Sequence, residues 1–477
     1  MELVERVRKA REYEEALYGE LRDHPIDLDD LFDAVVKTIH YNYVGYEHKK
    51  QYFTPAEYHT YVFSHYRYGT LTVEMLVRSL HQFAGDMHDR HLTFYCDDWI
   101  DYRNLAASYR VRASKDVLYV TQADPDTGLV PGDKILKVQG MTPEKVRRLT
   151  RHNCFFSREP ERELWGGYLR MAQSLTVEHA DGSQETMKIK LSPLAEQTLT
   201  IEEQYPVLFA MYPDSSGASK TAYIRMERMD TKAINDLCAE HSSELENADK
   251  LILDLRRCIG GEEGAGWNLF PLLLDHEEKL SNLIADEGSY VLCTRNNCDI
   301  RLSLLKSARE QIISSLETEK AARPEPDSEM LSSYQEQLAI IDDQIRFYKE
   351  NYAKGLIFAE PEPIEDEVLS PAAKAPGKIV ILLDTFCENE GEQFAAMCRR
   401  CGSKVQIAGR PSMGTLDYYD PIRLKVHEHM ILSYPIRMTK AAFEGRGISE
   451  KGIQPDIYIP WTPEEIERDV IRGRFLD

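Results

Sequence analysis

Apolar residues at helical spacing dominate the first part of the chain. In residues 28–44 and 72–88 they recur every three or four positions, which predicts amphipathic helices. The N-terminal stretch MELVERVRKAREYEEALYGEL has the same charged, amphipathic character and lacks the apolar core of a signal peptide. We therefore expect an N-terminal helical domain over residues 1–100.

The pattern changes after residue 105. The strand-like runs SYRVRAS and VLYVTQAD precede the segment GLVPGDKILKVQG. In TPEKVRRLT, Thr142 suits the N-cap of a helix and Pro143 its first position. Further on, Asp181-Gly182 lies at the centre of LTVEHADGSQETMKIKLS, as in the turn of a β-hairpin. These features predict a β-rich module over residues 105–195.

The rest of the chain alternates between strands and helices. The runs KLILDLRRC and GKIVILLD are almost continuously apolar, which is typical of strands buried in a parallel sheet. Strand–helix–strand units over residues 200–301 and 354–477 predict one discontinuous α/β domain. Residues 302–353 interrupt it with apolar positions at helical spacing on both sides of ARPEPD, which predicts an inserted helical hairpin. Such a hairpin is a solvated excursion, a contact for a second copy of the chain or a surface for another partner, so a homo-oligomer stays open.

The charge balance narrows the class of partner. The 477 residues include 58 Lys and Arg against 80 Asp and Glu, a formal charge of −22. Nucleic-acid backbones and anionic membrane surfaces both need a basic face, so we expect neither as a partner. No stretch reaches the roughly 18 consecutive apolar residues of a membrane-spanning helix.

The cysteines predict the compartment and argue against a metal. Nine cysteines form no dense framework and no signal peptide precedes them, so we expect reduced thiols in a cytoplasmic protein. Cys398 and Cys401 form a C-x-x-C pair, but zinc needs a second pair, and Cys293 and Cys298 are spaced too widely to supply it. We therefore expect no metal and no cofactor.

The junction at residues 384–391 is the main candidate for chemistry. There the chain passes from a buried strand through a turn into a helix. Such a junction exposes one side chain and points the N–H groups of the helix at an anion, as attack on a peptide carbonyl requires. The pair Gly260-Gly261 follows the other buried strand, where it either permits close backbone approach or forms a tight turn.

Four separated segments resemble the tail-specific, or C-terminal-processing, serine peptidases, a group related to the tricorn protease core. LVRSLHQFAGDMHDRHLTF resembles the helix and D-x-H-T segment of the family, GLVPGDKILKVQG its PDZ-type segment, and LILDLRRCIGG its L-I-L-D-L-R-x-N-x-G-G turn. ILLDTFCENEGEQFA, VQIAGRPSMGT and KGIQPDIYIP resemble the nucleophile elbow, the following turn and the closing G-I-x-P-D segment. The resemblance implies an α/β fold with an N-terminal helical region, a PDZ-like module and a crotonase/ClpP-like peptidase domain interrupted by the hairpin.

The resemblance also implies roles for individual residues. It puts the nucleophile at residue 389, where N-E-G-E-Q-F has asparagine in place of serine. It assigns the general base to His91 and the third member of a triad to Glu450, which lies about one residue out of register. The oxyanion donors that it implies are the backbone N–H groups of Gly260 or Gly261 and of Glu390. Without the resemblance, His91 would read as a structural, hydrogen-bonded histidine, and so would His88.

The substitution at position 389 leaves alternatives for the nucleophile. An asparagine amide does not hydrolyse peptide bonds in trans, and no lysine base stands at the aligned position near Thr415. Cys387 lies on the same turn, although the glutamates around it would raise the pKa of a thiol. Ser412 lies on the adjacent turn.

Two functions follow from this sequence. The first is that of a tail-specific peptidase relative that binds extended peptides, unfolded segments or protein C-termini, with serine-type hydrolysis implied by the resemblance. The second is that of a non-catalytic peptide-binding or scaffolding protein. Whether the chain is an enzyme, which peptide it binds and the register of the turn at 386–392 are not decided by the sequence.

Overall fold

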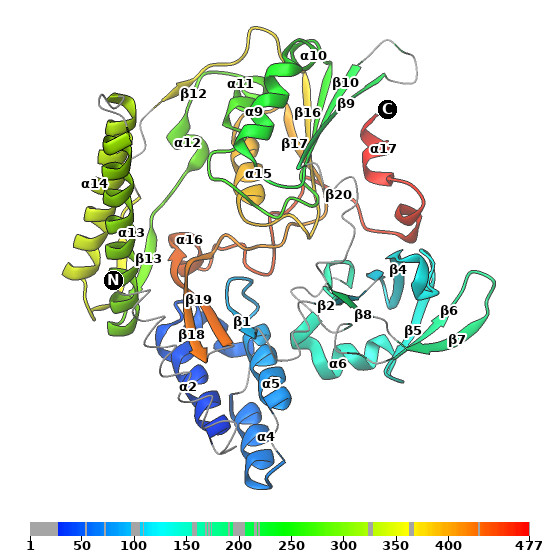
Figure 1. Cartoon of the computed structure of the whole chain (residues 1–477). Helices are drawn as coiled ribbons and strands as arrows, with labels where there is room; N and C mark the ends of the chain where they lie inside the picture. Colours follow the sequence, from blue (N-terminus) through cyan, green and yellow to red (C-terminus); the bar gives the residue numbers. More distant parts are fainter. Residues whose placement is uncertain are drawn as a thin grey trace. The chain divides into compact units, whose positions relative to one another are not determined.

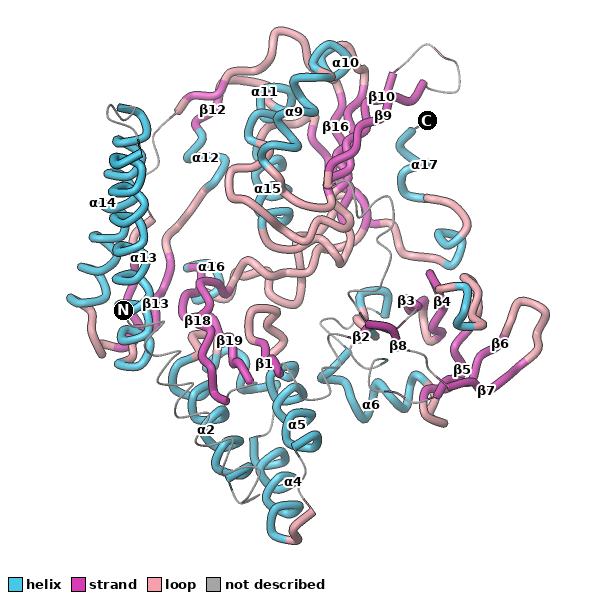
Figure 2. Tube along the Cα trace, in the orientation of Figure 1, coloured by secondary structure: helices cyan, strands magenta, loops and turns pink. Residues whose placement is uncertain are grey.

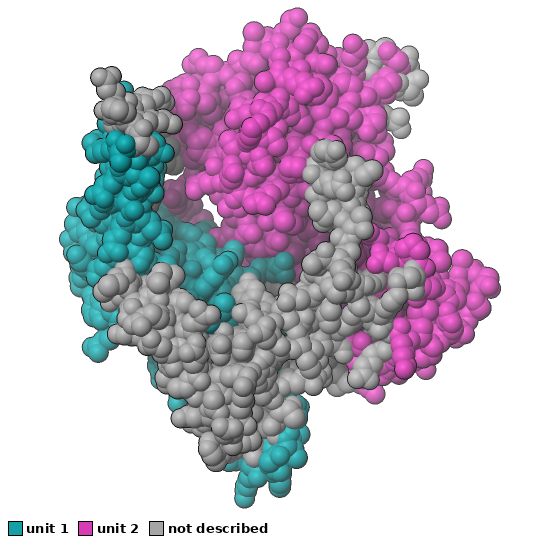
Figure 3. Space-filling view, in the orientation of Figure 1, with its two compact units in different colours: residues 1–101, 288–361, 418–445 teal, residues 102–287, 362–417, 446–477 magenta. Residues whose placement is uncertain are grey.

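The computed structural model describes most of the chain in two compact units. The described residues are 27–52, 55–70, 73–96, 105–107, 109–154, 160–166, 169, 172, 174–188, 191–193, 206–213, 217, 220–322, 328–361, 367–427 and 430–476. Unit 1 comprises residues 1–101, 288–361 and 418–445, and unit 2 comprises residues 102–287, 362–417 and 446–477 (Figure 3). The predicted helix at residues 1–21 lies outside the described residues.

Unit 1 combines helices with a five-stranded antiparallel sheet. Its helices are α2 (Asp27–Asn42), α3 (Tyr46–Lys49), α4 (Pro55–Arg67), α5 (Val73–Asp86), α13 (Arg295–Ala322), α14 (Ser328–Glu350) and α16 (Lys440–Phe443). Its strands are β1 (Thr93–Cys96), β13 (Ser289–Cys293), β14 (Gly355–Ala359), β18 (Tyr418–His427) and β19 (Met430–Thr439). On α2, the buried residues Leu31, Val35 and Ile39 repeat every four positions, and they pack with residues of α5 and the sheet in one core. The helices predicted at 28–44 and 72–88 are thereby confirmed.

The long helices α13 and α14 correspond to the predicted insertion (Figure 1). They follow β13 and precede β14, which pair with each other. Leu305 and Tyr348 are buried in the core of unit 1, whereas Ile340 is exposed, so one end of the pair packs against the unit.

β18 and β19 pair with each other, and β19 also pairs with β1 and β13 in unit 1. The predicted division into four domains stays a prediction.

Unit 2 contains a six-stranded, mostly parallel sheet in the order β20-β17-β16-β11-β10-β9. Its strands are β9 (Val207–Pro213), β10 (Lys220–Met226), β11 (Lys250–Asp254), β16 (Lys378–Leu383), β17 (Val405–Gly409) and β20 (Ile457–Tyr458). Only the pair β9–β10 is antiparallel. The apolar runs that predicted parallel strands form β11 and β16 at the centre of this sheet, which confirms that prediction.

Helices cover both faces of the parallel sheet (Figures 1 and 2). On one side Ile379, Ile381 and Leu383 of β16 pack in a core shared with helices of unit 2. These helices are α9 (Thr231–Glu240), α10 (Ser242–Glu246), α11 (Phe270–Leu273), α12 (Leu280–Ile284) and α15 (Glu390–Arg400). On the other side Val380 and Leu382 pack with α17 (Val470–Leu476). Since both faces are covered, every residue of the strand after Lys378 is apolar.

The region predicted as a β-rich module forms an antiparallel sheet in unit 2. Its strands, in spatial order, are β3 (Tyr109–Ser114), β4 (Val117–Ala123), β5 (Lys134–Val138), β6 (Ser174–Glu178) and β7 (Gln184–Lys188). The Asp181-Gly182 hairpin is confirmed, with Gly182 at φ +82°. Thr142 caps α6 (Pro143–Cys154) as predicted, because its hydroxyl accepts the Lys145 N–H.

Short strand pairs complete the described fold. They are β2 (Leu105–Ala107) with β8 (Leu191–Pro193), and β12 (Glu278–Lys279) with β15 (Val368–Leu369). The protein therefore has a mixed α/β fold with several sheets. In the part of the chain that the structure describes, no helix has both the length and the apolar character to cross a bilayer.

Candidate active site

Three neighbouring parallel strands, β11, β16 and β17, bring the candidate residues of unit 2 to one edge of the sheet. Gly260 and Gly261 follow β11, Asn389 follows β16, and Thr415 follows β17. Loops at the carboxyl ends of adjacent parallel strands meet, which is where open α/β sheets bind ligands. The topology thus collects residues that lie up to 155 positions apart (260 to 415).

Asn389 occupies a strained turn between β16 and α15. Its backbone has φ +53° and ψ −128°, outside the regions that non-glycine residues usually adopt. Its N–H donates to the Thr415 hydroxyl over 2.8 Å, and its carbonyl accepts the N–H groups of Glu392 and Gln393. Such strain costs about 1–3 kcal/mol and persists only where neighbouring contacts hold it. The turn from β16 into α15 therefore has its strained residue at position 389.

The glycine pair is required for close packing against this turn. A methyl group on Gly260 would lie 2.7 Å from the Asn389 Cβ, and one on Gly261 would lie 2.1 Å from the Met229 carbonyl oxygen. Both glycines have positive φ, +97° and +149°. The pair therefore serves close backbone approach, one of the two readings that the sequence allowed, and it places Gly260 against Asn389.

The Glu390 carboxylate accepts a hydrogen bond from the Gly261 N–H, one of the groups that the resemblance implies as oxyanion donors. The Gly261 N–H donates to Glu390 Oε2 over 3.0 Å. The structure thus brings Gly260, Gly261, Asn389 and Glu390 together. The Gly261 N–H already has a partner within the chain, the Glu390 carboxylate.

Glu392 is a buried carboxylate that the sequence did not single out. It accepts hydrogen bonds from the Ser412 and Thr415 hydroxyls and from the Gly414 and Thr415 N–H groups, at 2.5–2.7 Å. Burial raises the pKa of Glu392, and these hydrogen bonds oppose the rise. The helical spacing of the sequence could have indicated its burial, because Glu392 lies three residues before Ala395 on the buried face of α15.

The two alternative nucleophiles are enclosed in the protein. Cys387 is fully buried, and burial raises the pKa of its thiol. Ser412 is also fully buried, and its hydroxyl donates to Glu392 and accepts the Ile453 N–H over 2.7 Å. Because both side chains are fully buried, a substrate carbonyl does not reach either group in this conformation.

Glu450 lies on a turn that packs against the loop carrying Thr415. A methyl group on Gly414 would lie 3.2 Å from the Glu450 nitrogen, and the Glu450 carbonyl accepts a hydrogen bond from Arg162. Glu450 itself has φ +68°. Its backbone is therefore in the same loop cluster as Thr415, and its role as third member of a triad stays a prediction.

His91 belongs to unit 1, on the turn between α5 and β1. Its N–H donates to Asp89 Oδ1 over 2.9 Å, and its Nδ1 lies 3.9 Å from the same oxygen. The Tyr43 hydroxyl donates to the other oxygen of Asp89 over 2.7 Å. The side chain of His91 is 24% exposed. The role of His91 as general base stays a prediction.

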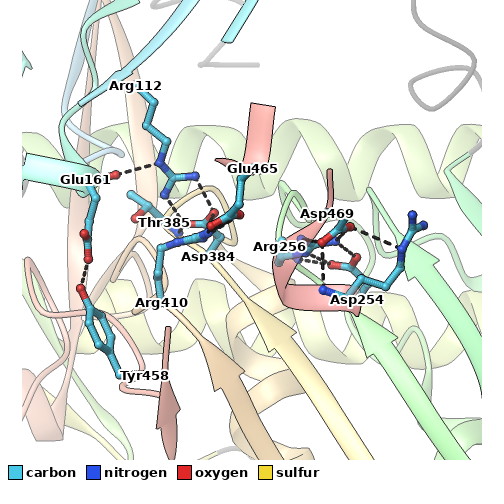
Figure 4. Close-up of polar contacts among 11 residues, drawn as sticks. Arg112, Glu161, Asp254, Arg256, Asp384, Thr385, Arg410, Tyr458, Glu465 and Asp469 are labelled. Atoms are coloured by element: carbon cyan, nitrogen blue, oxygen red, sulfur yellow. Dashed lines mark hydrogen bonds and ion pairs between the residues drawn. The ribbon is translucent and has the colours of Figure 1, made fainter. Parts of the chain in front are cut away.

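A buried ion-pair cluster connects the antiparallel sheet to the end of β16 (Figure 4). Arg112 of β3 donates two hydrogen bonds to the Asp384 carboxylate, at 2.7 and 2.5 Å. Burial alone would raise the pKa of Asp384, but the guanidinium groups of Arg112 and Arg410 outweigh it and hold the pKa well below its usual range. Arg410 also pairs with Glu465.

Arg162 makes a second connection to the site, because it donates to the backbone carbonyls of Ser412 and Glu450. Neither connection was predictable from local sequence patterns, since Arg112 and Asp384 are 272 residues apart. Within the described residues, no group of three His, Cys, Asp or Glu side chains is placed to hold a metal ion.

The comparisons with known proteins agree with this architecture. A model of peptidase family S41 matches residues 220–459, half of the chain, so the chain belongs to peptidase family S41. Mature CPAF is similar in structure, with a TM-score of 0.62 and 14% sequence identity over 94% of this chain and 95% of that chain. Mature CPAF complexed with lactacystin gives a TM-score of 0.59 and 13% identity over 94% and 96% of the two chains. No curated protein matches the sequence.

Removing the Thr415 hydroxyl is expected to loosen the turn. Thr415→Val removes the hydroxyl that accepts the Asn389 N–H and donates to one oxygen of Glu392. Leaving a buried polar group without its hydrogen bond costs about 1–3 kcal/mol. Thr415→Ser keeps the hydroxyl and is the matched control. Urea denaturation measures the free energy of unfolding of both variants. Equal destabilisation by valine and serine would show that the hydroxyl does not support the turn.

Proposed function

We propose that this protein binds extended peptides or protein C-termini on the S41 peptidase fold and does not hydrolyse them by the serine mechanism. The observation that carries the proposal is the backbone of Asn389. The residue with strained backbone at the start of α15, where we place the nucleophile elbow, is an asparagine.

The chemistry of the side chain supports the non-catalytic part of the proposal. Acyl transfer needs a hydroxyl or thiol that a nearby base can deprotonate. The nitrogen lone pair of a carboxamide is delocalised into its carbonyl, so Asn389 offers no comparable nucleophile. Cys387 and Ser412 are buried and do not substitute for it.

The fold supports the binding part of the proposal. Family membership suggests a peptide or protein ligand. We assign the antiparallel sheet at 105–195 to a PDZ-like module, in which a peptide adds as an extra strand at the edge of the sheet. The segment GLVPGD is ordered by Asp133, whose carboxylate accepts the Val130 N–H over 2.8 Å. Arg112 and Arg162 attach the region of this module to the loops around Asn389.

Peptide binding without turnover is the expected result for the wild-type protein. Fluorescence anisotropy with labelled, unstructured peptides should give saturable binding, and mass spectrometry of the same samples should recover intact peptide. Two results would contradict the proposal. One is cleavage by the wild type that disappears in His91→Ala, and the other is the absence of binding to any unstructured peptide in a diverse set.

A further inference from the structure

The Gly261 N–H is held in a fixed direction by the surrounding backbone. Gly261 forms a bridge with Met229, the Glu262 N–H donates to the Met229 carbonyl over 2.7 Å, and the Met229 N–H donates to the Gly260 carbonyl over 2.8 Å. A methyl group on Gly261 would collide with the Met229 carbonyl. This N–H therefore keeps its direction, and any partner has to occupy the position at which it points.

The partner that this donor has in the structure is an anion. Glu390 Oε2 accepts the Gly261 N–H over 3.0 Å, and it lies 2.8 Å from where a Cβ on Gly260 would stand. Only glycine at position 260 leaves space for the carboxylate there. Glu390 is also the first residue of α15, a helix of 11 residues, where the helix dipole favours a negative charge.

The local backbone holds Glu390 in this place. The preceding residue, Asn389, is fixed through its N–H on Thr415, so the Glu390 side chain starts from a defined position. Its carboxylate then needs only its own side-chain torsions to reach or leave the Gly261 N–H. Breaking this contact therefore requires no change in the backbone at Glu390.

We propose that Glu390 is a built-in competitor that occupies a carboxylate-binding position at the Gly261 N–H and must be displaced by the terminal carboxylate of a bound peptide. This inference rests on the proposed function, since it names the ligand group that meets the site. A second carboxylate cannot share the single donor with Glu390, because the two negative charges repel and the donor has one hydrogen. Vacating the position should therefore favour peptides with a free C-terminus over the same peptides with a C-terminal amide.

Matched variants separate the effect of filling the position at the Gly261 N–H from the effect of the negative charge of Glu390. Glu390→Ala vacates the position. Glu390→Gln removes the charge but keeps an oxygen that can accept the Gly261 N–H, so the position stays filled. Glu388→Ala removes the same charge from the same turn, and the Glu388 backbone N–H to the Cys258 carbonyl is retained.

The test measures the ratio of the dissociation constants of the amidated and free-acid forms of one unstructured peptide. A charge-assisted hydrogen bond is worth enough for about a tenfold change in affinity. We expect Glu390→Ala to raise this ratio about tenfold over the wild type, while Glu390→Gln and Glu388→Ala leave it nearly unchanged. Thermal unfolding of each variant checks that it is folded. An unchanged ratio in Glu390→Ala, or an equal rise in Glu388→Ala, would overturn the inference.

A second measurement does not depend on peptide binding. With the protein labelled by ¹⁵N-glycine, the Gly261 amide resonance is followed during titration with sodium acetate. We expect a saturable shift in Glu390→Ala and none in the wild type. If no peptide binds to any variant, the proposed function fails, and the acetate titration still decides whether Glu390 occupies a carboxylate position. The same response in both proteins would overturn the inference.

Discussion

Replacing Asn389 with serine is expected to give the protein a peptidase activity that exceeds that of the wild type by on the order of 10³-fold or more, because the nucleophile of a serine peptidase accounts for a large share of its rate. Serine is smaller than asparagine, so it fits against Gly260. The backbone hydrogen bond to Thr415 does not depend on the side chain at 389 and should keep the turn in place. Hydrolysis of unstructured peptides, followed by mass spectrometry, measures the gain.

The controls for this prediction assign the activity to the proposed residues. Asn389→Ala removes the carboxamide, as the serine variant does, but adds no hydroxyl, so it should remain inactive. His91→Ala in the serine background should remove the gain, since the resemblance makes His91 the base. Glu390→Ala in that background should add about 10²-fold, the usual effect of one oxyanion donor. Equal turnover by the serine and alanine variants at 389 would refute the role proposed for this position.

Removing Arg112 is expected to cost about 3–5 kcal/mol in the free energy of unfolding of unit 2, the usual penalty for leaving one partner of a buried ion pair. The side chains of Arg112 and Asp384 are 9% and 7% exposed, and Arg410 approaches Asp384 only to 3.4 Å. Arg410 is also engaged by Glu465, so it cannot fully replace the lost charge. Urea denaturation of Arg112→Ala against the wild type gives the difference directly.

An exposed ion pair provides the matched control for Arg112→Ala. Arg468 pairs with Glu464 on the surface of unit 2, and such pairs contribute about 0–1 kcal/mol.

The pH dependence of the stability gives a further check. The pKa of Asp384 is lower in the folded than in the unfolded protein, so its stabilising effect is present above the unfolded pKa of about 3.8 and is lost as the pH falls below it. The effect of Arg112→Ala should therefore shrink in acid. An effect no larger than that of Arg468→Ala would contradict the assignment.

The elements that the sequence predicted well are those with a strong local pattern. The apolar runs of β11 and β16 are explained by burial on both faces of a sheet, and the Asp181-Gly182 turn by the positive φ that glycine permits. The pairing partners of β18 and β19 were not predictable in the same way, because an alternating strand does not specify which sheet it joins.

The candidate site was predictable only in part, for a related reason. The resemblance located the turn after β16, but the conformation of residue 389 depends on Thr415, which arrives from the next strand. The contact of Arg112 with Asp384, and that of Glu390 with Gly261, join segments 272 and 129 residues apart. Such contacts follow from the topology of the sheet and carry no signature in either segment alone.

The most direct test of the account is covalent labelling with a fluorophosphonate probe, followed by mass-spectrometric mapping of the modified residue. The account predicts no labelled residue in the wild-type protein and a single label at position 389 in Asn389→Ser. A label on Ser412, Cys387 or any other residue of the wild type, with peptide cleavage that the label abolishes, would show that the protein keeps an active nucleophile and would contradict the central claim.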